Sequence, residues 1–477
     1  MFLLILVYLC FAIVRPQDFL PGMANLPVMS ITLLLAFVGW LLRGARTSGA
    51  PQFLLLPVFV LIAMASEVIS GWSGGMQYVI EQMGPSLIVF FVLASALDNP
   101  RRTAIAFAVI GLCAMVLALH SVQQAEQGVG WTGMTLGEDG RIRYVGIFND
   151  PNDLGLLFVM ALPMVVCLAS RAGFFGRWFW RIGAVLLLFG VYLTKSRGTQ
   201  LAVLLMGAVW LWQKRGLLTA GSLGFVGLVG LMLMPSTRMN DLDPDEESAF
   251  GRVDAWYEGL DMFKTHPLFG VGFGNFTDYN TLTAHNSFVL VLAETGFLGF
   301  MTWLAFVGYC FWMMWRLLRL QTGLARAVQA TVHAVAAVRP QARLALAPPL
   351  PVDVDVVQRR QALVRGRVGA TANPGTAPDQ HDTAAEARQA RAEQALSLTL
   401  FCALCGFFLA AFFLSRSYNI MLYTLAAVAV GHYANMRQRH DTLPRFALSV
   451  SGWRWLPIAL VSVVALYILV AILLRTS

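Results

Sequence analysis

The residues of this chain whose types could perform chemistry are a few cations and one histidine beside strongly apolar runs. Lys195 and Arg197 flank Ser196 in "TKSRGT", and Arg252 opens "RVDAWYEGL". A guanidinium is permanently charged, and its planar fork donates paired hydrogen bonds to a phosphate group. His285 opens "HNSFVLVLAETG", where the N-terminus of a helix would lower its pKa and leave a neutral base near neutral pH. These types suit a step in which a phosphate group departs and a hydroxyl group loses its proton.

The composition predicts the kind of element that must position these residues. Of the 477 residues, 57% are hydrophobic and 13% are charged, and the mean hydropathy is +0.66. Soluble domains average about 25% charged residues, and apolar runs long enough to cross about 30 Å of hydrocarbon recur along this chain. We therefore predict an all-α, polytopic membrane protein of about 12–13 transmembrane helices. The net charge of +8 is better explained by basic cytoplasmic loops than by a nucleic-acid partner.

The apolar runs predict where the spans lie, and the basic residues between them predict the orientation. The runs are near residues 2–14, 25–42, 52–70, 84–97, 103–119, 153–170, 181–194, 199–212, 217–234, 286–315, 396–414, 419–434 and 455–473. Arg and Lys accumulate in cytoplasmic loops, so alternate loops can be assigned to a side. The set expected to face outward comprises residues 15–24, 71–83, 120–150, 195–198, 235–285 and 415–418.

Two segments between the spans differ from short loops. Residues 235–285 form a large outward loop with an amphipathic helix at 250–265, whose apolar face carries Val253, Trp256, Tyr257, Leu260 and Phe263. Residues 316–395 are a basic, Ala/Arg/Pro-rich cytoplasmic insertion with possible helix at each end, and we expect it to be largely disordered between these ends because it has almost no aromatic residues. The predicted organisation is transmembrane helices over 1–234, this large loop, one transmembrane helix over 286–315, the insertion, and C-terminal transmembrane helices over 396–477.

The cations in outward loops need an explanation other than topology. The group comprises Arg15, Arg141, Arg143, Lys195, Arg197, Arg252 and Arg416. Each one could simply pair with a carboxylate or with lipid phosphate, but for the group an anion site is the better explanation. Asp150, Asn152 and Asp153 of "NDPND" suit sugar binding, and capping of the following helix accounts for them equally well. His285 could likewise be an interfacial residue at a helix end.

Four stretches, taken in order, resemble the superfamily of O-antigen ligases and O-antigen polymerases of the Wzy type. They are "RYVGIFNDPNDLG", "TKSRGT", "GRVDAWYEGLDMFKTHPLFGVGFGNF" and "HNSFVLVLAETGFLG". With the spans around them they cover roughly residues 80–315, and the large outward loop before the histidine matches the family pattern. The opening "VRPQDFLPG" resembles a subgroup of exosortase-associated O-glycosylation ligases. The long insertion departs from the short loop usual in the family.

The resemblance implies a C-type glycosyltransferase in the bacterial inner membrane whose active site faces the periplasm. It implies transfer of a glycan from undecaprenyl diphosphate, with His285 as base and Arg197 and Arg252 as catalytic cations. The resemblance also implies that the substrate is bound by Arg143, Lys195, Asn152 and Asp150. No carboxylate-rich cage is visible in the sequence, so we expect neither a metal nor another cofactor.

The acceptor hydroxyl is expected on the lipid A core, and a polymerase or a protein O-oligosaccharyltransferase stays open as an alternative. The other expected partners are the membrane lipids. A lipid or polysaccharide transporter is the alternative from another class, and it predicts interrupted spans at the middle of the membrane.

Overall fold

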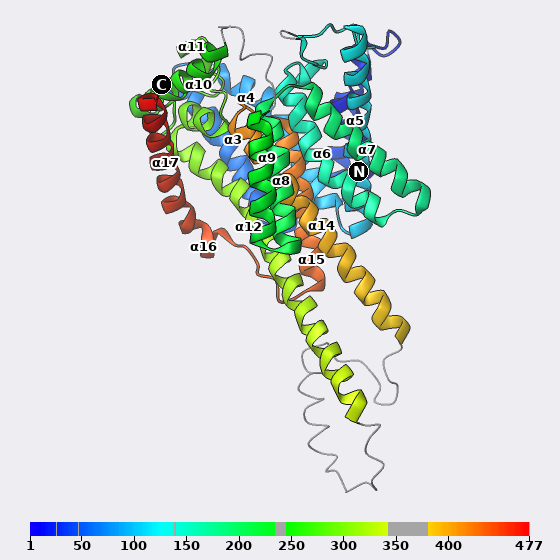
Figure 1. The fold of residues 1–477 in the computed structure, drawn as a ribbon. Helices are drawn as coiled ribbons and strands as arrows, with labels where there is room; N and C mark the ends of the chain where they lie inside the picture. The colour runs from blue at the N-terminus through cyan, green and yellow to red at the C-terminus, as the bar shows by residue number, and fades with distance from the viewer. Residues whose placement is uncertain (25, 46, 138–139, 234–244, 342–379, 477) are drawn as a thin grey trace. The chain divides into compact units, whose positions relative to one another are not determined.

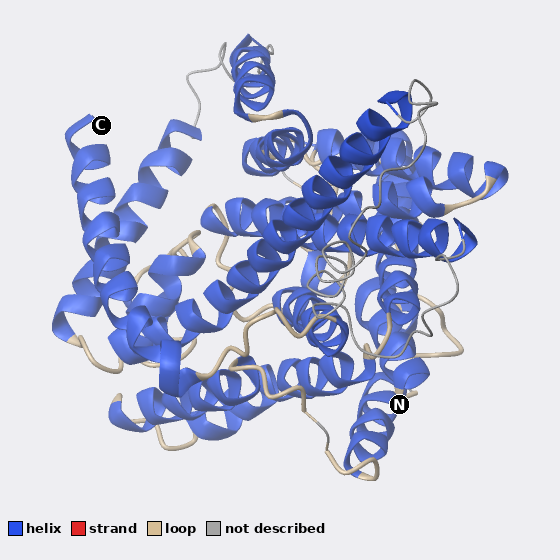
Figure 2. Ribbon diagram, turned by 90° about the horizontal axis from the view of Figure 1, so that it is seen from below, coloured by secondary structure: helices blue, strands red, loops and turns tan. Residues whose placement is uncertain are grey.

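The computed structural model describes residues 1–24, 26–45, 47–137, 140–233, 245–341 and 380–476. Within these ranges the chain forms helices joined by loops, with no strand (Figure 2). An isolated bridge between Val129 and Thr135 is the nearest approach to sheet pairing among them. The predicted all-α class is confirmed.

The helices follow one another along the chain as Figure 1 shows. They are α1 (Phe2–Val14), α2 (Val28–Leu41), α3 (Gln52–Ile69), α4 (Gly75–Ala96), α5 (Pro100–Gln127), α6 (Pro151–Arg171), α7 (Phe174–Leu193), α8 (Arg197–Arg215), α9 (Leu217–Leu233), α10 (Asp245–Thr265), α11 (Phe276–Tyr279), α12 (Ser287–Gln341), α14 (Gln380–Phe412), α15 (Ile420–Arg439), α16 (Leu448–Ser451) and α17 (Trp455–Thr476).

Eight helices in the described ranges are long and apolar enough to cross a membrane. They belong to α3, α4, α5, α6, α7, α12, α14 and the segment that ends in α17. Three shorter apolar helices are α1, α2 and the first part of α9. The two remaining predicted spans coincide with α8 and α15. The chain is therefore a multi-pass membrane protein.

The chain divides into two compact units. The first comprises Met1–Leu317 with Ala395–Ser477, and the second is Leu318–Gln394. The second unit corresponds closely to the predicted insertion, and helix is present at both of its ends, where α12 leaves the first unit and α14 leads back to it. Its middle, residues 342–379, where we predicted disorder, lies outside the described residues. All features below belong to the first unit.

Several helices extend further than hydropathy predicted, and α5 and α4 are the two that border the loops of the site. α5 continues past residue 119 to Gln127, and α4 begins at Gly75 rather than near residue 84. The added residues of α5 include Ala, Gln and Glu, which are good helix formers although they are polar. Gly128, in the left-handed conformation at φ 75°, then ends the helix. The loop before α6, which we expected to face outward, is correspondingly shorter than the predicted 120–150.

Burial separates the central helices from the peripheral ones. The apolar windows of α6, α12 and α14 are 72–78% buried, whereas those of α7 and α17 are 22% buried. Figure 1 shows α7 and α17 at opposite edges of the bundle. Side chains on the central helices are packed against several neighbouring helices. Polar groups at the ends of α6 and α12 therefore have well-defined positions.

α12 is interrupted at Gly296, and a preceding segment of the chain fills the interruption. Gly296 has φ 61° and ψ −166°, a conformation that is almost exclusive to glycine. The amide of Phe297 donates to the carbonyl of Pro267 at 2.8 Å, and the amide of Val271 donates to the carbonyl of Ala293 at 2.9 Å. The stretch "GVGFGN" is thus a glycine-rich turn that hydrogen-bonds to the backbone of α12 at its interruption.

The amphipathic helix of the large loop is α10, and it ends just before His266 as predicted. Trp256 and Leu260 are buried, and the Trp256 ring packs 5.6 Å from that of Phe412 on α14. Tyr257, which we expected on the apolar face, is 43% exposed, and Nζ of Lys264 lies 5.4 Å from the centre of its ring. The hydroxyl of Tyr467 on α17 donates to the carbonyl of Leu260 at 3.1 Å. These contacts fix the helix that carries Arg252.

Candidate functional site

A cavity of about 1080 Å³ lies where the outward-predicted segments meet. Its walls come from α1, α2, α4, the loop before α6, the first turn of α6, α10 and the loop between α14 and α15. Its charged lining residues are Arg15, Glu81, Arg141, Arg143, Asp150, Asp153, Arg252 and Arg416. The five arginines outnumber the three carboxylates, so the cavity attracts anions.

Three of the predicted site residues line this cavity: Arg143, Asp150 and Arg252. Asp150 is also the N-cap of α6, and its carboxylate accepts a hydrogen bond of 2.6 Å from the amide of Asn152. The capping interpretation of the "NDPND" motif is therefore confirmed for Asp150, and sugar binding stays a prediction. Arg143 donates from Nε to the carbonyl of Thr135 at 3.0 Å, a contact that orients its guanidinium.

The other four predicted residues, Lys195, Arg197, Asn152 and His285, are not part of the cavity lining. Lys195 and Arg197 are exposed, and Arg197 is the first residue of α8. A side chain added at Gly140 would lie 3.6 Å from Nζ of Lys195, so the "TKSRGT" loop touches the loop that lines the cavity. The structure thus places Lys195 beside a loop that lines the cavity, and Arg197 follows two residues later in the chain.

Asn152 joins these two loops through Arg141. The guanidinium of Arg141 donates to Oδ1 of Asn152 at 2.9 Å and to the carbonyl of Thr194 at 3.0 Å. Ser196 then caps α8 by accepting from the amide of Thr199. Asn152 therefore acts in this structure as a link between the α6 and α8 termini.

His285 lies directly before the N-terminus of α12, as predicted. The side chain of Asn286 caps that helix by accepting from the amides of Phe288 and Val289 at 2.9 and 3.1 Å. The capping role therefore belongs to Asn286, and the imidazole is left for another role. His285 has φ 46°, a left-handed conformation that costs energy for a residue with a Cβ atom.

Burial lowers the pKa of His285 below its usual range, and the positive charge of Arg252 lowers it further. The negative charge of Asp150 opposes this shift, and the charge of Arg416 adds to it. All three of these charged residues line the cavity. The imidazole is half-buried and neutral at neutral pH. It does not line the cavity, but the charges of the cavity residues shift its pKa.

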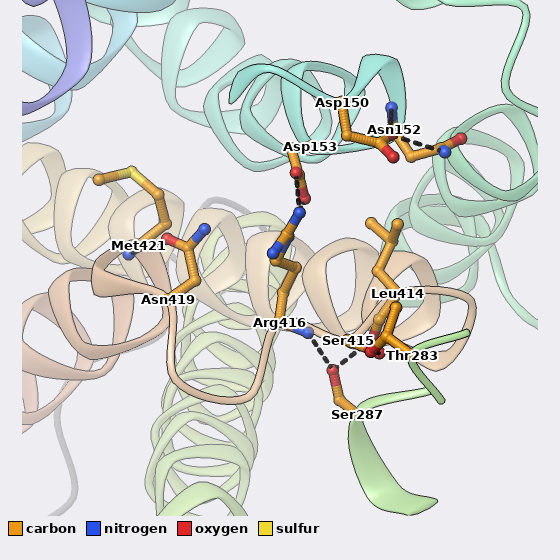
Figure 3. Close-up of polar contacts among 10 residues, drawn as sticks. All are labelled: Asp150, Asn152, Asp153, Thr283, Ser287, Leu414, Ser415, Arg416, Asn419 and Met421. Atoms are coloured by element: carbon orange, nitrogen blue, oxygen red, sulfur yellow. Dashed lines mark hydrogen bonds and ion pairs between the residues drawn. The ribbon is translucent and has the colours of Figure 1, made fainter. Parts of the chain in front are cut away.

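Sequence reasoning missed the most closely paired charges of the site. The guanidinium of Arg416 donates from Nε and Nη2 to the two carboxylate oxygens of Asp153, as Figure 3 shows. Both residues line the cavity. They are separated by 263 positions in the chain, so no local pattern connects them. The available signals were separate ones, namely Arg416 among the outward cations and Asp153 in the "NDPND" motif.

His120 is not part of the cavity lining. His120 is buried against the rings of Trp131 and Tyr144, with its Nε2 3.1 Å from the hydroxyl of Thr132. This enclosure agrees with a structural role.

Within the part of the chain that the structure describes, no three His, Cys, Asp or Glu side chains lie close enough together to hold a metal ion.

One family model matches the chain, and its description is O-Antigen ligase. The match covers residues 182–304, which include Lys195, Arg197, Arg252 and His285 but not the "NDPND" motif or Arg416. A search of curated proteins gives no match. The match supports glycan transfer of the O-antigen ligase or polymerase type, and it confirms the resemblance to the O-antigen ligase superfamily that the ordered motifs predicted.

Proposed function

We propose that the protein transfers an oligo- or polysaccharide from undecaprenyl diphosphate to an acceptor hydroxyl group at the periplasmic face of the bacterial inner membrane. The observation that supports this most is the arginine-rich cavity next to a half-buried, neutral histidine. A lipid diphosphate requires permanent cations, and an acceptor hydroxyl requires a base. The family match supports, in general terms, a lipid-linked glycan and an acceptor as the two substrates.

In the proposed reaction, His285 removes the proton of the acceptor hydroxyl, and the oxygen attacks the anomeric carbon of the donor sugar. The bond from that carbon to the diphosphate oxygen breaks, and its electron pair stays on the diphosphate. Arg252 and Arg143 stabilise the charge that develops there. Attack opposite the leaving group inverts the anomeric configuration. Asp150 accepts hydrogen bonds from the sugar with the oxygen that does not cap α6.

Lys195 touches a loop that lines the cavity, Arg197 begins α8 two residues later, and we assign both to the donor diphosphate as it enters. Asn152 supports them by holding Arg141 between the two loops. The acceptor is most simply the lipid A core. A polymerase or a protein O-oligosaccharyltransferase would use the same donor site, so these alternatives differ only in the acceptor.

The interrupted helix α12 favours a transporter at first sight, because broken helices line many transport sites. In such sites the exposed backbone groups at the break bind the substrate. Here the carbonyls of Ala293 and Glu294 accept from the amides of Val271 and Gly272, and the amide of Phe297 donates to Pro267. Those groups are used by the protein itself. The break in α12 therefore holds the loop that follows α10 in place. Glycan transfer remains a better proposal than transport.

The test supplies the purified protein with undecaprenyl-diphosphate glycan and with each candidate acceptor, and identifies the product by mass spectrometry. His285→Ala should abolish transfer while the donor still binds, and Arg252→Lys should remove most activity although the charge is kept. Activity should persist in a chelator. Wild-type protein that forms no glycosidic product with any acceptor, or that needs magnesium or calcium, would contradict the proposal.

A further inference from the structure

The Arg416–Asp153 pair holds one edge of a guanidinium and leaves the other for a ligand. Nε and Nη2 of Arg416 donate to Asp153, so Nη1 and the second proton of Nη2 form the edge not used by this pair. The Asp153 side chain is 1% exposed, whereas the Arg416 side chain retains 38% exposure. Both line the cavity, and the guanidinium is therefore both oriented and accessible.

The backbone around Arg416 is tied to the segment that carries His285. The amide of Arg416 donates to the hydroxyl of Ser287 at 3.0 Å, and the hydroxyl of Ser417 donates to the carbonyl of Ser287 at 2.7 Å. Thr283 donates to the hydroxyl of Ser415 at 2.8 Å. Figure 3 shows Arg416 between Asp153 on α6 and Ser287 at the start of α12. The loop thus has a fixed place relative to both segments.

A purely structural ion pair explains these contacts less well than a binding role does. A pair that only joins α6 to the 413–419 loop gains nothing from an exposed guanidinium edge. Arg416 also shares the cavity with Arg141, Arg143 and Arg252, and like charges in one cavity repel each other. An anion bound among them would remove that cost. The arrangement is what a diphosphate site needs before its ligand arrives.

We propose that Arg416 is a further residue that contacts the donor diphosphate, and that Asp153 is the residue that positions it. The assignment rests on the proposed function. It adds a contact from the C-terminal part of the chain, outside the segment that matches the ligase family. Arg416 would place the open edge of its guanidinium on phosphate oxygens while Asp153 keeps the plane of the group fixed.

The test measures the affinity of the purified full chain for farnesyl diphosphate and for farnesyl monophosphate, together with the unfolding temperature. Arg416→Lys keeps the charge and can keep the contact with Asp153, but an ammonium group lacks the planar fork. We expect its affinity for the diphosphate to fall about tenfold with little change in unfolding temperature. Arg102→Lys is the matched control, because Arg102 pairs with Asp98 at 2.5 Å and is not part of the cavity lining.

A double-mutant cycle tests the positioning role of Asp153. Asp153→Asn should weaken diphosphate binding in the wild-type background and add little further loss in Arg416→Gln, since there is then no guanidinium to orient. Additive losses would overturn the positioning role.

The outcomes separate this proposal from the proposed function. If the wild type binds farnesyl diphosphate and Arg416→Lys binds it equally well, Arg416 has no contact with the diphosphate and the transferase proposal stands. A loss of affinity that merely follows a loss of folded protein overturns the contact as well. If the wild type binds no prenyl diphosphate, the proposed function fails and the role of Arg416 fails with it.

Discussion

Arg141 and Asn152 form a 2.9 Å hydrogen bond that connects the loop before α6 to the first turn of α6, and the same guanidinium reaches the carbonyl of Thr194. Replacement of Arg141 by Ala removes both contacts and releases the loop that carries Lys195 and Arg197. We expect transfer activity to fall at least about tenfold, because hydrogen bonds from a charged donor contribute roughly 1.5–3 kcal/mol each. Initial rates of glycan transfer measure this.

The control for Arg141 is Arg181→Ala on the peripheral helix α7, where Arg181 stacks 5.2 Å from the ring of Trp178. This change should leave the rate near that of the wild type. Equal rates for Arg141→Ala and the wild type would show that the link between the two loops is dispensable.

The pH dependence of transfer should report the charges around His285. Only the neutral imidazole is a base, so activity should be lost as the pH falls through the pKa of His285. Burial, Arg252 and Arg416 lower this pKa, so the loss should lie below pH 6.5, the usual value for histidine. The measurement is kcat/KM against pH for the wild type. A midpoint at or above the usual value would contradict a buried base beside these arginines.

The acid limb of this profile is the pH range over which kcat/KM is lost as the pH falls. Two substitutions should shift this limb in opposite directions. Arg252→Gln removes a positive charge that lowers the pKa of His285, so the limb should shift to higher pH. Asp150→Asn removes a negative charge that raises the pKa, so the limb should shift to lower pH. The residual activity of each variant, followed across the pH range, gives the midpoint. Shifts of the same sign would mean that another group titrates.

Hydropathy predicted the helices because the length of an apolar run is a local property. The spans near 52–70 and 153–170 reappear as α3 and α6 within a few residues. The end of α5 was placed too early because a polar helix that continues beyond the apolar run leaves no hydropathy signal. The break at Gly296 was not predicted, because it depends on the segment near Pro267, which pairs with the interrupted backbone.

The site was predictable only as a set of residue types. Arg143, Arg252 and Asp150 were expected in one place and do share a cavity, whereas Arg197 lies outside its lining. Arg197 begins α8 and is exposed, and no local pattern in the sequence distinguishes such a position from one in the cavity lining. The contact between Arg416 and Asp153 joins residues 263 positions apart, and one sequence alone carries no sign of such a pairing.

The glycine at the break of α12 should tolerate no side chain. A Cβ atom at Gly296 would collide with the backbone of Leu268, and the conformation itself is unfavourable for other residues. We expect Gly296→Ala to lower the free energy of unfolding by about 1–3 kcal/mol. Gly221→Ala is the control, because Gly221 lies in α9 with nothing within 4 Å of an added Cβ, and Ala favours helix there.

Thermal or denaturant unfolding in detergent compares these two glycine variants. Loss of stability in Gly296→Ala with an unchanged or raised stability in Gly221→Ala is the expected result. Equal stability of both would mean that the segment near Pro267 does not depend on the shape of the break.

The two ends of α8 should label from opposite sides of the membrane. Arg197 begins this helix and is exposed, and Arg215 ends it beside Lys214. The charge rule predicts that Lys214 and Arg215 lie in the cytoplasm, and alternation of the loops then predicts that Arg197 faces the periplasm. An impermeant maleimide should therefore label Arg197→Cys in intact spheroplasts and label Arg215→Cys only after permeabilisation. The wild type is the control, since its cysteines are buried or half-buried. The reverse pattern would place the arginine-rich cavity on the cytoplasmic side, where the proposed donor, exposed at the periplasmic face, could not reach it.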